Sequence, residues 1–171
     1  PSGRVSEKWG LGVGVFMSIV SLAFAYSIDY LVFIATLVGV LCAWIYSIEP
    51  IRLKKSAFFG PGIVAICYEG LPWFTGAAIF SATFPNKNVL IILMLYAIGA
   101  HGIMTLNDFK ASKGDRISGV KSLPVILGHK LAAYVACTIM LIPQILVVGL
   151  FVYWGGLTGI ATLLTLMLAT Q

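Results

Sequence analysis

The longest polar run in the chain, residues 107–124, holds the side chains that could do chemistry. Its sequence, NDFKASKGDRISGVKSLP, contains two carboxylates, Asp108 and Asp115, and four basic residues. A continuous helix would place the carboxylates on one face, about 10.5 Å apart along the axis. Both could not then ligate one Mg²⁺ directly, since its ligand distances are about 2.0–2.1 Å. A ligand with several phosphate oxygens and one or two Mg²⁺ ions would fit between them, which indicates a polyphosphate with an apolar tail.

The same composition has a plainer explanation. Cytoplasmic loops of membrane proteins are often rich in Lys and Arg because these residues fix the topology of the chain. Acidic residues in such a loop then serve only solubility. Composition alone therefore leaves open whether residues 107–124 form a reaction site or a topology signal.

The chain as a whole has the composition of an all-α integral membrane protein. Of its 171 residues, 60% are hydrophobic and 10% are charged, and its mean hydropathy is +1.01. Soluble domains carry about 25% charged residues. The net charge of +5 comes without a nucleic-acid-binding signature, so no nucleic-acid partner is expected. Cys42, Cys67 and Cys137 lie in apolar stretches without metal-binding spacing and are expected to be packing residues.

Six apolar spans are expected to form transmembrane helices. They cover residues 9–28, 30–48, 57–82, 89–106, 131–154 and 156–170. The third is interrupted by Pro61 and Pro72, and Pro143 is expected to kink the fifth. The sixth is short for a span.

The basic residues divide unequally between the two sides of these spans. One side receives the amino terminus and the loops 49–56 and 107–130, with ten of the eleven Lys and Arg residues, and the other receives only Lys87. The positive-inside rule makes the first side cytoplasmic. The loop EPIRLKKS at 49–56 then shares a membrane face with the aspartates, where its cations could bind either a diphosphate or anionic lipids.

Two ionisable residues lie inside the spans. Glu69 is near the middle of its span, where such a group rarely faces lipid. It is either a cavity contact or a protonated or paired structural carboxyl. His101 precedes Asp108 by seven residues, which places it two turns deeper on the same helical face. It is either a metal or substrate contact or a packing histidine.

Three stretches resemble the UbiA-type membrane prenyltransferases, in particular the branch that esterifies bacteriochlorophyll and chlorophyll precursors. They are YSIEPIRLKK (46–55), CYEGLPWFTGA (67–77) and GAHGIMTLNDFKASKGDRISGVKSLPVILG (99–128). The last carries the family's second aspartate-rich motif and its G-x-x-S-L-P-V continuation. The resemblance implies a nine-helix bundle, of which residues 1–171 would form a partial domain without the first two helices, the first aspartate-rich motif (NDxxDxxxD) and the last helix. Such a piece is expected to be inactive alone. Lys113 stands where the branch is expected to have Glu.

The resemblance also implies a reaction and its site. The full-length protein would transfer a geranylgeranyl or phytyl group from its diphosphate to the propionate carboxylate of bacteriochlorophyllide, with Mg²⁺ as cofactor. Asp108 and Asp115 would be the catalytic Mg²⁺ ligands, assisted by Asn107. The expected diphosphate contacts are Arg52, Lys54, Lys55, Arg116 and Tyr46. The expected acceptor-side residues are Tyr68, Glu69, Trp73 and His101, the last as an axial ligand of the pigment's magnesium.

This reading places the protein in the bacterial inner membrane or an intracytoplasmic photosynthetic membrane, with the motif loops cytoplasmic. Partners could include other pigment-biosynthesis or assembly proteins. Three alternatives stay open. One is a chlorophyll synthase or a UbiA-type enzyme acting on a quinone precursor. Another is a transporter or lipid-binding protein that uses the basic loops as headgroup contacts. The third is a scaffold that binds pigment through His101 without chemistry.

Overall fold

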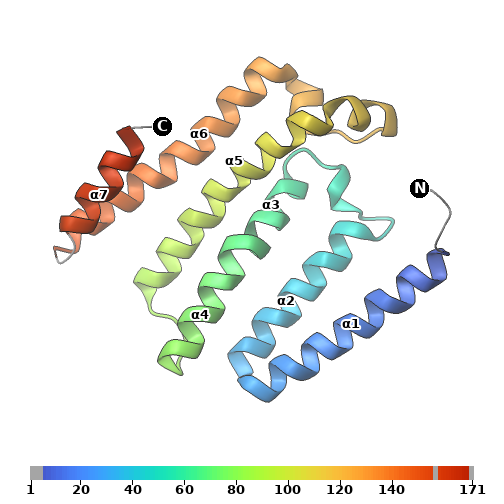
Figure 1. Cartoon of the computed structure of the whole chain (residues 1–171), viewed down its shortest axis with the longest axis horizontal. Coiled ribbons are helices and arrows are strands. Elements are labelled where there is room, and N and C mark those ends of the chain that lie inside the picture. Colours follow the sequence, from blue (N-terminus) through green and yellow to red (C-terminus); the bar gives the residue numbers. More distant parts are fainter. Residues whose placement is uncertain (1–5, 156–157, 170–171) are drawn as a thin grey trace.

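A computed structural model describes residues 6–155 and 158–169 of the chain, and its regular structure is helical. The α-helices are α1 (Glu7–Ile28), α2 (Tyr30–Ser47), α3 (Phe59–Ala65), α4 (Leu71–Ser81), α5 (Lys87–Ser118), α6 (Leu123–Tyr153) and α7 (Thr158–Ala169). A 3-10 turn, η1 (Leu53–Lys55), precedes α3, and a π-helical turn, η2 (Ile66–Gly70), joins α3 to α4. The helices lie side by side in a curved row, with the two ends of the chain at opposite edges (Figure 1). The prediction of an all-α membrane fold is confirmed.

Polar caps explain where several helices begin and end. Ser6 accepts a hydrogen bond from Trp9 N at the start of α1, and Asn86 accepts one from Val89 N at the start of α5. Asp29 caps α2 by accepting from Leu31 N at 2.7 Å. These side chains satisfy amide groups that have no partner within the helix.

Five of the six predicted spans are long and apolar enough to cross a membrane within the described residues. They are Lys8–Ile28, Tyr30–Ser47, Phe59–Ser81, Lys87–Ser118 and Leu123–Tyr153. The sixth segment forms α7, whose 12 residues would reach only about 18 Å at about 1.5 Å per residue. A span of about 30 Å needs about 20 residues, so α7 as described is too short to cross alone. The predicted residues 156, 157 and 170 lie outside the described part.

Two boundaries differ from the prediction by more than two residues, and both concern the aspartate run. Helix α5 continues past residue 106 through both aspartates and ends at Ser118, followed by the C-cap Gly119, whose left-handed φ of 72° is typical of a helix C-terminus. Helix α6 begins at Leu123 and has a non-helical residue at Gly128, where φ is 75°. Hydropathy marks only the part of a helix inside the lipid. It therefore placed the end of α5 too early, at residue 106, and the start of α6 too late, at residue 131.

The prolines of the third span do not break it. Pro61 falls in the first turn of α3, where a missing N–H group costs no intrahelical hydrogen bond. Pro72 lies in the first turn of α4, which follows the π-helical turn η2 directly, and such local π adjustments accommodate proline within a transmembrane helix. The π-helical turn η2, which contains Glu69, lies between these segments. The helix α6 likewise continues through Pro143.

Helices α5 and α6 pack closely through small residues. Gly102 of α5 is buried, and a Cβ atom built on it would lie 2.5 Å from the Ala136 carbonyl oxygen and 2.5 Å from Met140 Cγ of α6. Ala132 and Ala136 of α6 are fully buried. Such close approach is how transmembrane helices gain packing energy in lipid. Trp44 of α2 ties that helix to α1 by donating to Ser18 Oγ at 3.1 Å.

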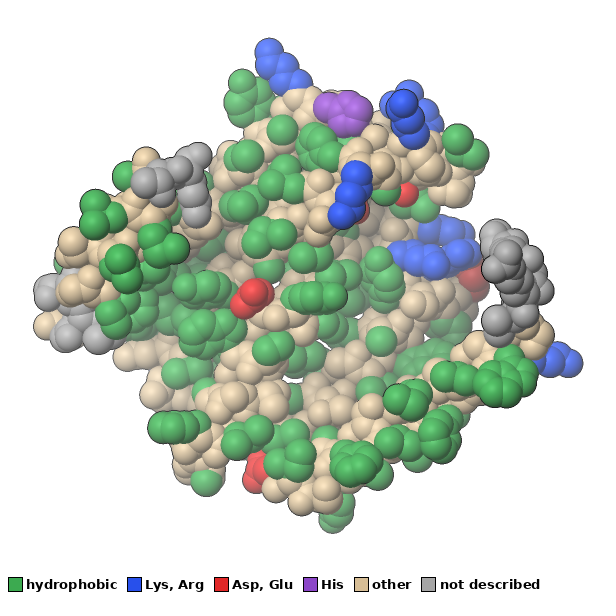
Figure 2. Space-filling model, viewed as in Figure 1, with side chains coloured by type: hydrophobic (Ala, Val, Ile, Leu, Met, Phe, Trp, Pro, Cys, Tyr) green, Lys and Arg blue, Asp and Glu red, His purple; other side chains and the backbone are tan. Residues whose placement is uncertain are grey.

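The surface is apolar over most of its area. Figure 2 shows hydrophobic side chains spread across the visible face, with Lys and Arg gathered along its upper and right-hand parts. The exposed apolar residues include Phe80 at 95% and Trp9 at 70%. This distribution is expected where the solvent is lipid.

Candidate functional site

A cavity of about 350 Å³ lies where the end of α5 meets α2, the basic loop and the start of α3. It is lined by Tyr46, Lys54, Ser56, Gly60, Pro61, Val64, Met104, Asn107, Asp108, Asp115, Val120 and Ser122. Its volume is in the range of small-molecule sites, which is about 300–1,000 Å³. Five of the residues predicted for the diphosphate and metal site therefore line one cavity.

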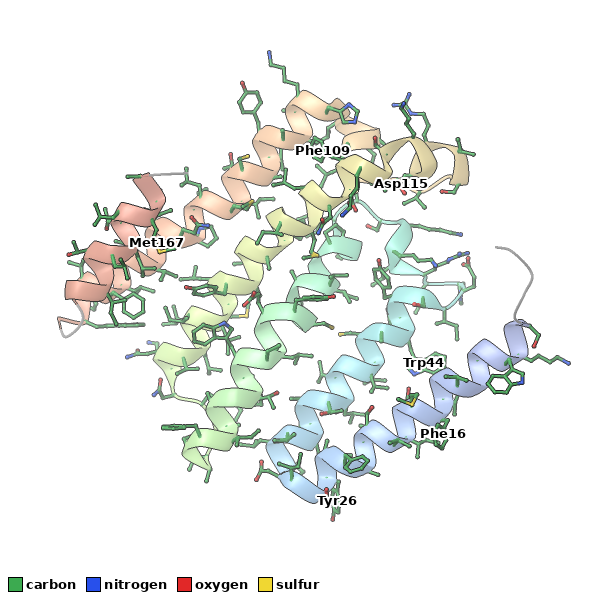
Figure 3. The ribbon with its side chains drawn as sticks, in the orientation of Figure 1. Phe16, Tyr26, Trp44, Phe109, Asp115 and Met167 are labelled. Carbon is green, nitrogen blue, oxygen red and sulfur yellow. The ribbon has the colours of Figure 1, made fainter. Side chains whose placement is uncertain are left out.

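The two aspartates are positioned by α5 alone. The helix is continuous from Asp108 to Asp115, so the two residues lie on one face of it, as predicted for a continuous helix. Both residues are partly buried and line the cavity. Figure 3 shows Asp115 in the last turns of α5. Among the described residues, neither aspartate has an ion-pair partner, because both ion pairs found there involve Glu49. Two carboxylates that line one cavity and form no ion pair in the described part of the chain favour the binding of an added cation beside Lys54.

The basic loop forms the opposite wall. Lys55 O accepts a hydrogen bond from Lys121 N at 3.1 Å, which ties the loop to the segment after α5. Gly60, at the start of α3, permits close contact with η1, since a Cβ atom there would lie 3.0 Å from Leu53 O. These contacts hold Lys54 at the cavity wall.

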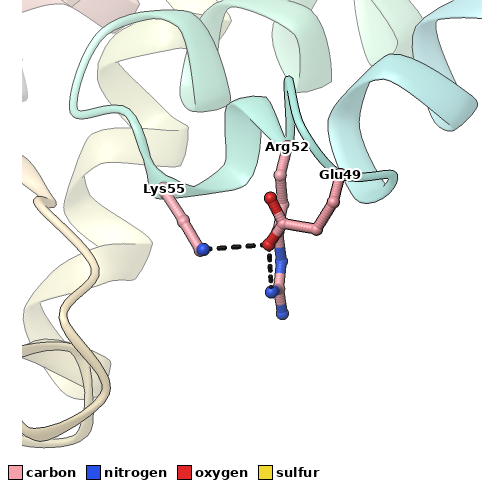
Figure 4. A network of polar contacts seen from close by, with 3 residues as sticks. All are labelled: Glu49, Arg52 and Lys55. Atoms are coloured by element: carbon pink, nitrogen blue, oxygen red, sulfur yellow. Dashed lines mark hydrogen bonds and ion pairs between the residues drawn. The ribbon is translucent and has the colours of Figure 1, made fainter.

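The other predicted diphosphate contacts lie outside the cavity lining. Arg52 Nη1 and Lys55 Nζ both donate to Glu49 Oε1, at 2.6 and 2.9 Å (Figure 4). The hydrogen bonds from Arg52, and then those from Lys55, lower the pKa of the Glu49 carboxyl. Arg116 is exposed in the last turn of α5. Lys113 is also exposed and does not line the cavity.

Two serines of the cavity were not predicted. Ser56 ends the basic loop, and Ser122 follows α5; Ser122 is only 3% exposed. Its Oγ atom is buried and has no hydrogen-bond partner among the described residues. Buried hydroxyls nearly always have a partner, so this one is available to a ligand. The sequence does contain a signal for Ser122, because it is the serine of the S-L-P-V continuation of the aspartate run. That continuation supported the family resemblance, but no role was predicted for the serine hydroxyl.

The cavity offers oxygen ligands of the type that Mg²⁺ prefers. Within the described ranges, no group of three or more His, Cys, Asp and Glu side chains is arranged to hold a metal. Mg²⁺ is usually bound by one or two carboxylates and completes its six ligands with water and substrate phosphates. Asp108, Asp115 and Asn107, together with the unpartnered Ser122 hydroxyl, fit one or two Mg²⁺ ions that are bound jointly with a diphosphate. They do not form a closed metal site.

The predicted acceptor-side residues are not in this cavity. Glu69 lines a second cavity of about 270 Å³ with residues of α5, α6 and α7, among them Gly99 and Gln144. Along α5, the second cavity is lined by residues 95–103 and the aspartate cavity by residues 104–115, so the two cavities lie at successive levels along the helix. The assignment of Glu69 to the acceptor side of the reaction site stays a prediction.

Trp73 and Tyr68 lie with Glu69 and away from the aspartates. Trp73 Nε1 donates to Glu69 Oε2 at 3.2 Å, and the Trp73 ring packs on Tyr96 with centroids 5.2 Å apart. The side chain of Tyr68 is exposed, at 68%. Glu69 therefore lines a cavity and is also hydrogen-bonded to Trp73, so its two alternatives, a cavity contact or a paired structural carboxyl, both stay open.

His101 is a packing residue in this structure. It is 7% exposed, its Nε2 atom is 2.9 Å from Phe58 O, and its ring lies 4.7 Å from the Phe58 ring. It links α5 to the start of α3 and does not line either cavity described above. Its suggested role as an axial ligand to a pigment is not supported by this position, because the ring is enclosed by protein.

The chain is similar to known proteins along its whole length. The model of the UbiA prenyltransferase family matches residues 1–171. The chain is 57% identical to the bacteriochlorophyll synthase 33 kDa chain of Cereibacter sphaeroides over 91% of this chain and 51% of that one. It is 40% identical to the bacteriochlorophyll synthase 34 kDa chain of Chloroflexus aurantiacus over 100% of this chain and 54% of that one. It is 33% identical to the chloroplastic chlorophyll synthase of Avena sativa over 92% of this chain and 43% of that one. The chain thus spans about half the length of the curated relatives it matches. No solved structure gives a significant match.

Proposed function

The chain belongs to the UbiA prenyltransferase family, and on that basis we propose that the full-length protein transfers a geranylgeranyl or phytyl group from its diphosphate to the propionate carboxylate of bacteriochlorophyllide. The observation that carries the proposal is the cavity at the end of α5. Within the described part of the chain, two aspartates without an ion pair, a lysine and a serine hydroxyl without a hydrogen-bond partner meet there. The printed names of the relatives at 57% and 40% identity support the pigment as acceptor.

The residues of the cavity would act on the leaving group. Asp108, Asp115 and Asn107 would hold Mg²⁺, which would supply positive charge to the diphosphate when bound. Lys54 and the Ser122 hydroxyl would donate to diphosphate oxygens, with Tyr46 as a further donor. These donors are fixed in place before the reaction, so they stabilise the charge that develops on the diphosphate as it departs.

The reaction needs little else from the protein. The bond between the allylic carbon and the diphosphate oxygen breaks, and its electron pair leaves with the diphosphate. A carboxylate oxygen of the propionate forms the new bond to that carbon. Because the propionate is already ionised near neutral pH, no general base has to remove a proton. Excluding water from the allylic carbon then matters more, and the apolar helices around the cavity suit that purpose.

The proposed location follows from the charge distribution. We place the cavity at the cytoplasmic face of the bacterial inner membrane or an intracytoplasmic photosynthetic membrane, since the basic loops surround it. The prenyl chain would extend from there into the apolar interior. Both substrates are amphipathic, with a polar end that suits the cavity and a long apolar part that suits the bilayer.

The test is product formation by the full-length protein in membranes. It is supplied with geranylgeranyl diphosphate and either bacteriochlorophyllide or an aromatic quinone precursor, with Mg²⁺ or with a chelator, and the products are identified by mass. The proposal predicts a Mg²⁺-dependent pigment ester. A prenylated quinone precursor instead would identify a different acceptor. Binding of pigment without any ester would favour the scaffold or transport alternatives and contradict the proposal.

A further inference from the structure

Glu49 holds the two cations of the basic loop that do not line the cavity. Its Oε1 atom accepts from Arg52 Nη1 at 2.6 Å and from Lys55 Nζ at 2.9 Å (Figure 4). The side chains are partly exposed, at 36% for Arg52, 47% for Lys55 and 55% for Glu49. They can therefore change partners without unfolding any helix.

The loop places these cations next to the cavity. Lys54 and Ser56, which flank Lys55 in the sequence, both line it. The hydrogen bond from Lys121 N to Lys55 O fixes the loop backbone at that wall. A change of partner by Arg52 and Lys55 would thus require rotation of side chains only.

Arg52 has an unused donor. Its Nε atom is buried and has no hydrogen-bond partner within the described part of the chain. A guanidinium group forms its strongest contacts through two parallel N–H groups to carboxylate or phosphate oxygens. Since Glu49 engages Nη1 through a single oxygen, the Arg52 contact to Glu49 leaves this capacity unfilled.

We propose that Glu49 is a positioning residue that competes with the substrate's diphosphate for Arg52 and Lys55. This inference rests on the proposed function, because it takes the Asp108 cavity as the diphosphate site. Before substrate binds, Glu49 neutralises the two cations. A diphosphate carries more negative charge than one carboxylate, so Arg52 and Lys55 leave Glu49 and bind the diphosphate. Glu49 recovers them as the product diphosphate leaves, which lowers the affinity for diphosphate and speeds its release.

The experiment measures the binding of inorganic diphosphate with Mg²⁺ to the full-length protein in nanodiscs, and the KM and kcat for the prenyl diphosphate. The variants are Glu49→Gln, Arg52→Gln/Lys55→Gln, and the triple combination. Glu49→Gln is expected to lower the Kd of diphosphate about three- to tenfold, the range of one or two exposed ion pairs. The KM should fall likewise, without a rise in kcat. In the Arg52→Gln/Lys55→Gln background, adding Glu49→Gln should leave the Kd unchanged.

The outcomes separate this inference from the proposed function. Unchanged or weaker binding by Glu49→Gln would mean that Glu49 only shapes the loop, and would overturn the inference alone. Tighter binding that persists without Arg52 and Lys55 would reflect the general loss of a negative charge, and would also overturn it. If the wild-type protein binds no diphosphate, the proposed function fails and the inference with it.

Discussion

Asp108 and Asp115 lie two turns apart on one helix, α5, and line the same cavity without a cation partner among the described residues. The helix thus places two negative charges at one cavity, whereas carboxylates on an ordinary surface are each surrounded by water. This relationship is the basis for treating the end of α5 as a binding site for a cation and an anionic substrate.

Removal of the Ser122 hydroxyl tests the cavity from the ligand side. Ser122→Ala is expected to raise the Kd of the prenyl diphosphate about ten- to hundredfold, since hydrogen bonds to charged groups contribute about 1.5–3 kcal/mol. The thermal stability of the ligand-free protein should hardly change, because Oγ has no partner to lose. Ser118→Ala is the matched control, since the Ser118 hydroxyl bonds Gly114 O of its own helix. Equal affinity in both variants would remove Ser122 from the site.

The lysine in the cavity should differ from a neighbouring lysine outside it. Lys54→Gln is expected to weaken diphosphate binding about tenfold or more, because Lys54 lines the cavity beside the aspartates. Lys110→Gln changes the same charge on an exposed residue of α5 that does not line the cavity, and should have an effect within about twofold. Isothermal titration with Mg²⁺ and inorganic diphosphate measures both. Similar losses in the two variants would mean that only the overall charge of the face matters.

The close contact of α5 with α6 should be sensitive to a single methyl group. Gly102→Ala places a Cβ atom 2.5 Å from the Ala136 carbonyl oxygen, and is expected to destabilise the protein by about 1–3 kcal/mol. Gly99→Ala, one turn earlier on α5, meets no atom within 4 Å and should be nearly neutral. Thermal unfolding in detergent checks the pair. Equal melting temperatures would contradict the packing described here.

The ion pairs of Glu49 predict a defined pH dependence. Hydrogen bonds from Arg52 and Lys55 lower the pKa of Glu49 from its ordinary value of 4.5. A lowered pKa in the folded state means that the stabilisation is fully present above the ordinary value and is lost as pH falls through the lowered one. The difference in melting temperature between wild type and Glu49→Gln should therefore stay constant from about pH 8 to 6, and shrink well below the ordinary carboxyl range. A difference that changes between pH 6 and 8 would require another titrating group.

Much of this arrangement could be predicted from the sequence, because it depends on local properties. Hydropathy located the spans, and the spacing of Asp108 and Asp115 gave their common face once the helix proved continuous. The rotation of one helix against another could not be predicted. Glu69 lies on a helix whose π-helical turn alters the direction of its side chains, so its position relative to the aspartates depended on packing.

The ion pairs of the basic loop could not be predicted from the sequence either. The loop sequence EPIRLKKS does not show which of its three basic residues reaches the cavity. In the structure, Lys54 lines the cavity, while Arg52 and Lys55 form ion pairs with Glu49. The left-handed backbone of Arg52, with φ of 40°, also has no signal in the sequence. The orphaned hydroxyl of Ser122 likewise becomes visible only when its neighbours are known.

The central claim is that the aspartates of α5 form a Mg²⁺-dependent diphosphate site used for pigment esterification. The most direct measurement is ester formation from bacteriochlorophyllide and geranylgeranyl diphosphate by full-length wild type, Asp108→Asn and Asp115→Asn in membranes, with Mg²⁺ and with a chelator. Asp29→Asn is the matched control, because it makes the same change at a helix cap outside the cavity. We predict a Mg²⁺-dependent ester from wild type and Asp29→Asn, and a loss of at least about a hundredfold in both cavity variants, as is typical when a preorganised electrostatic contact is removed. Equal ester formation by all four proteins, or formation that persists with the chelator, would contradict the account.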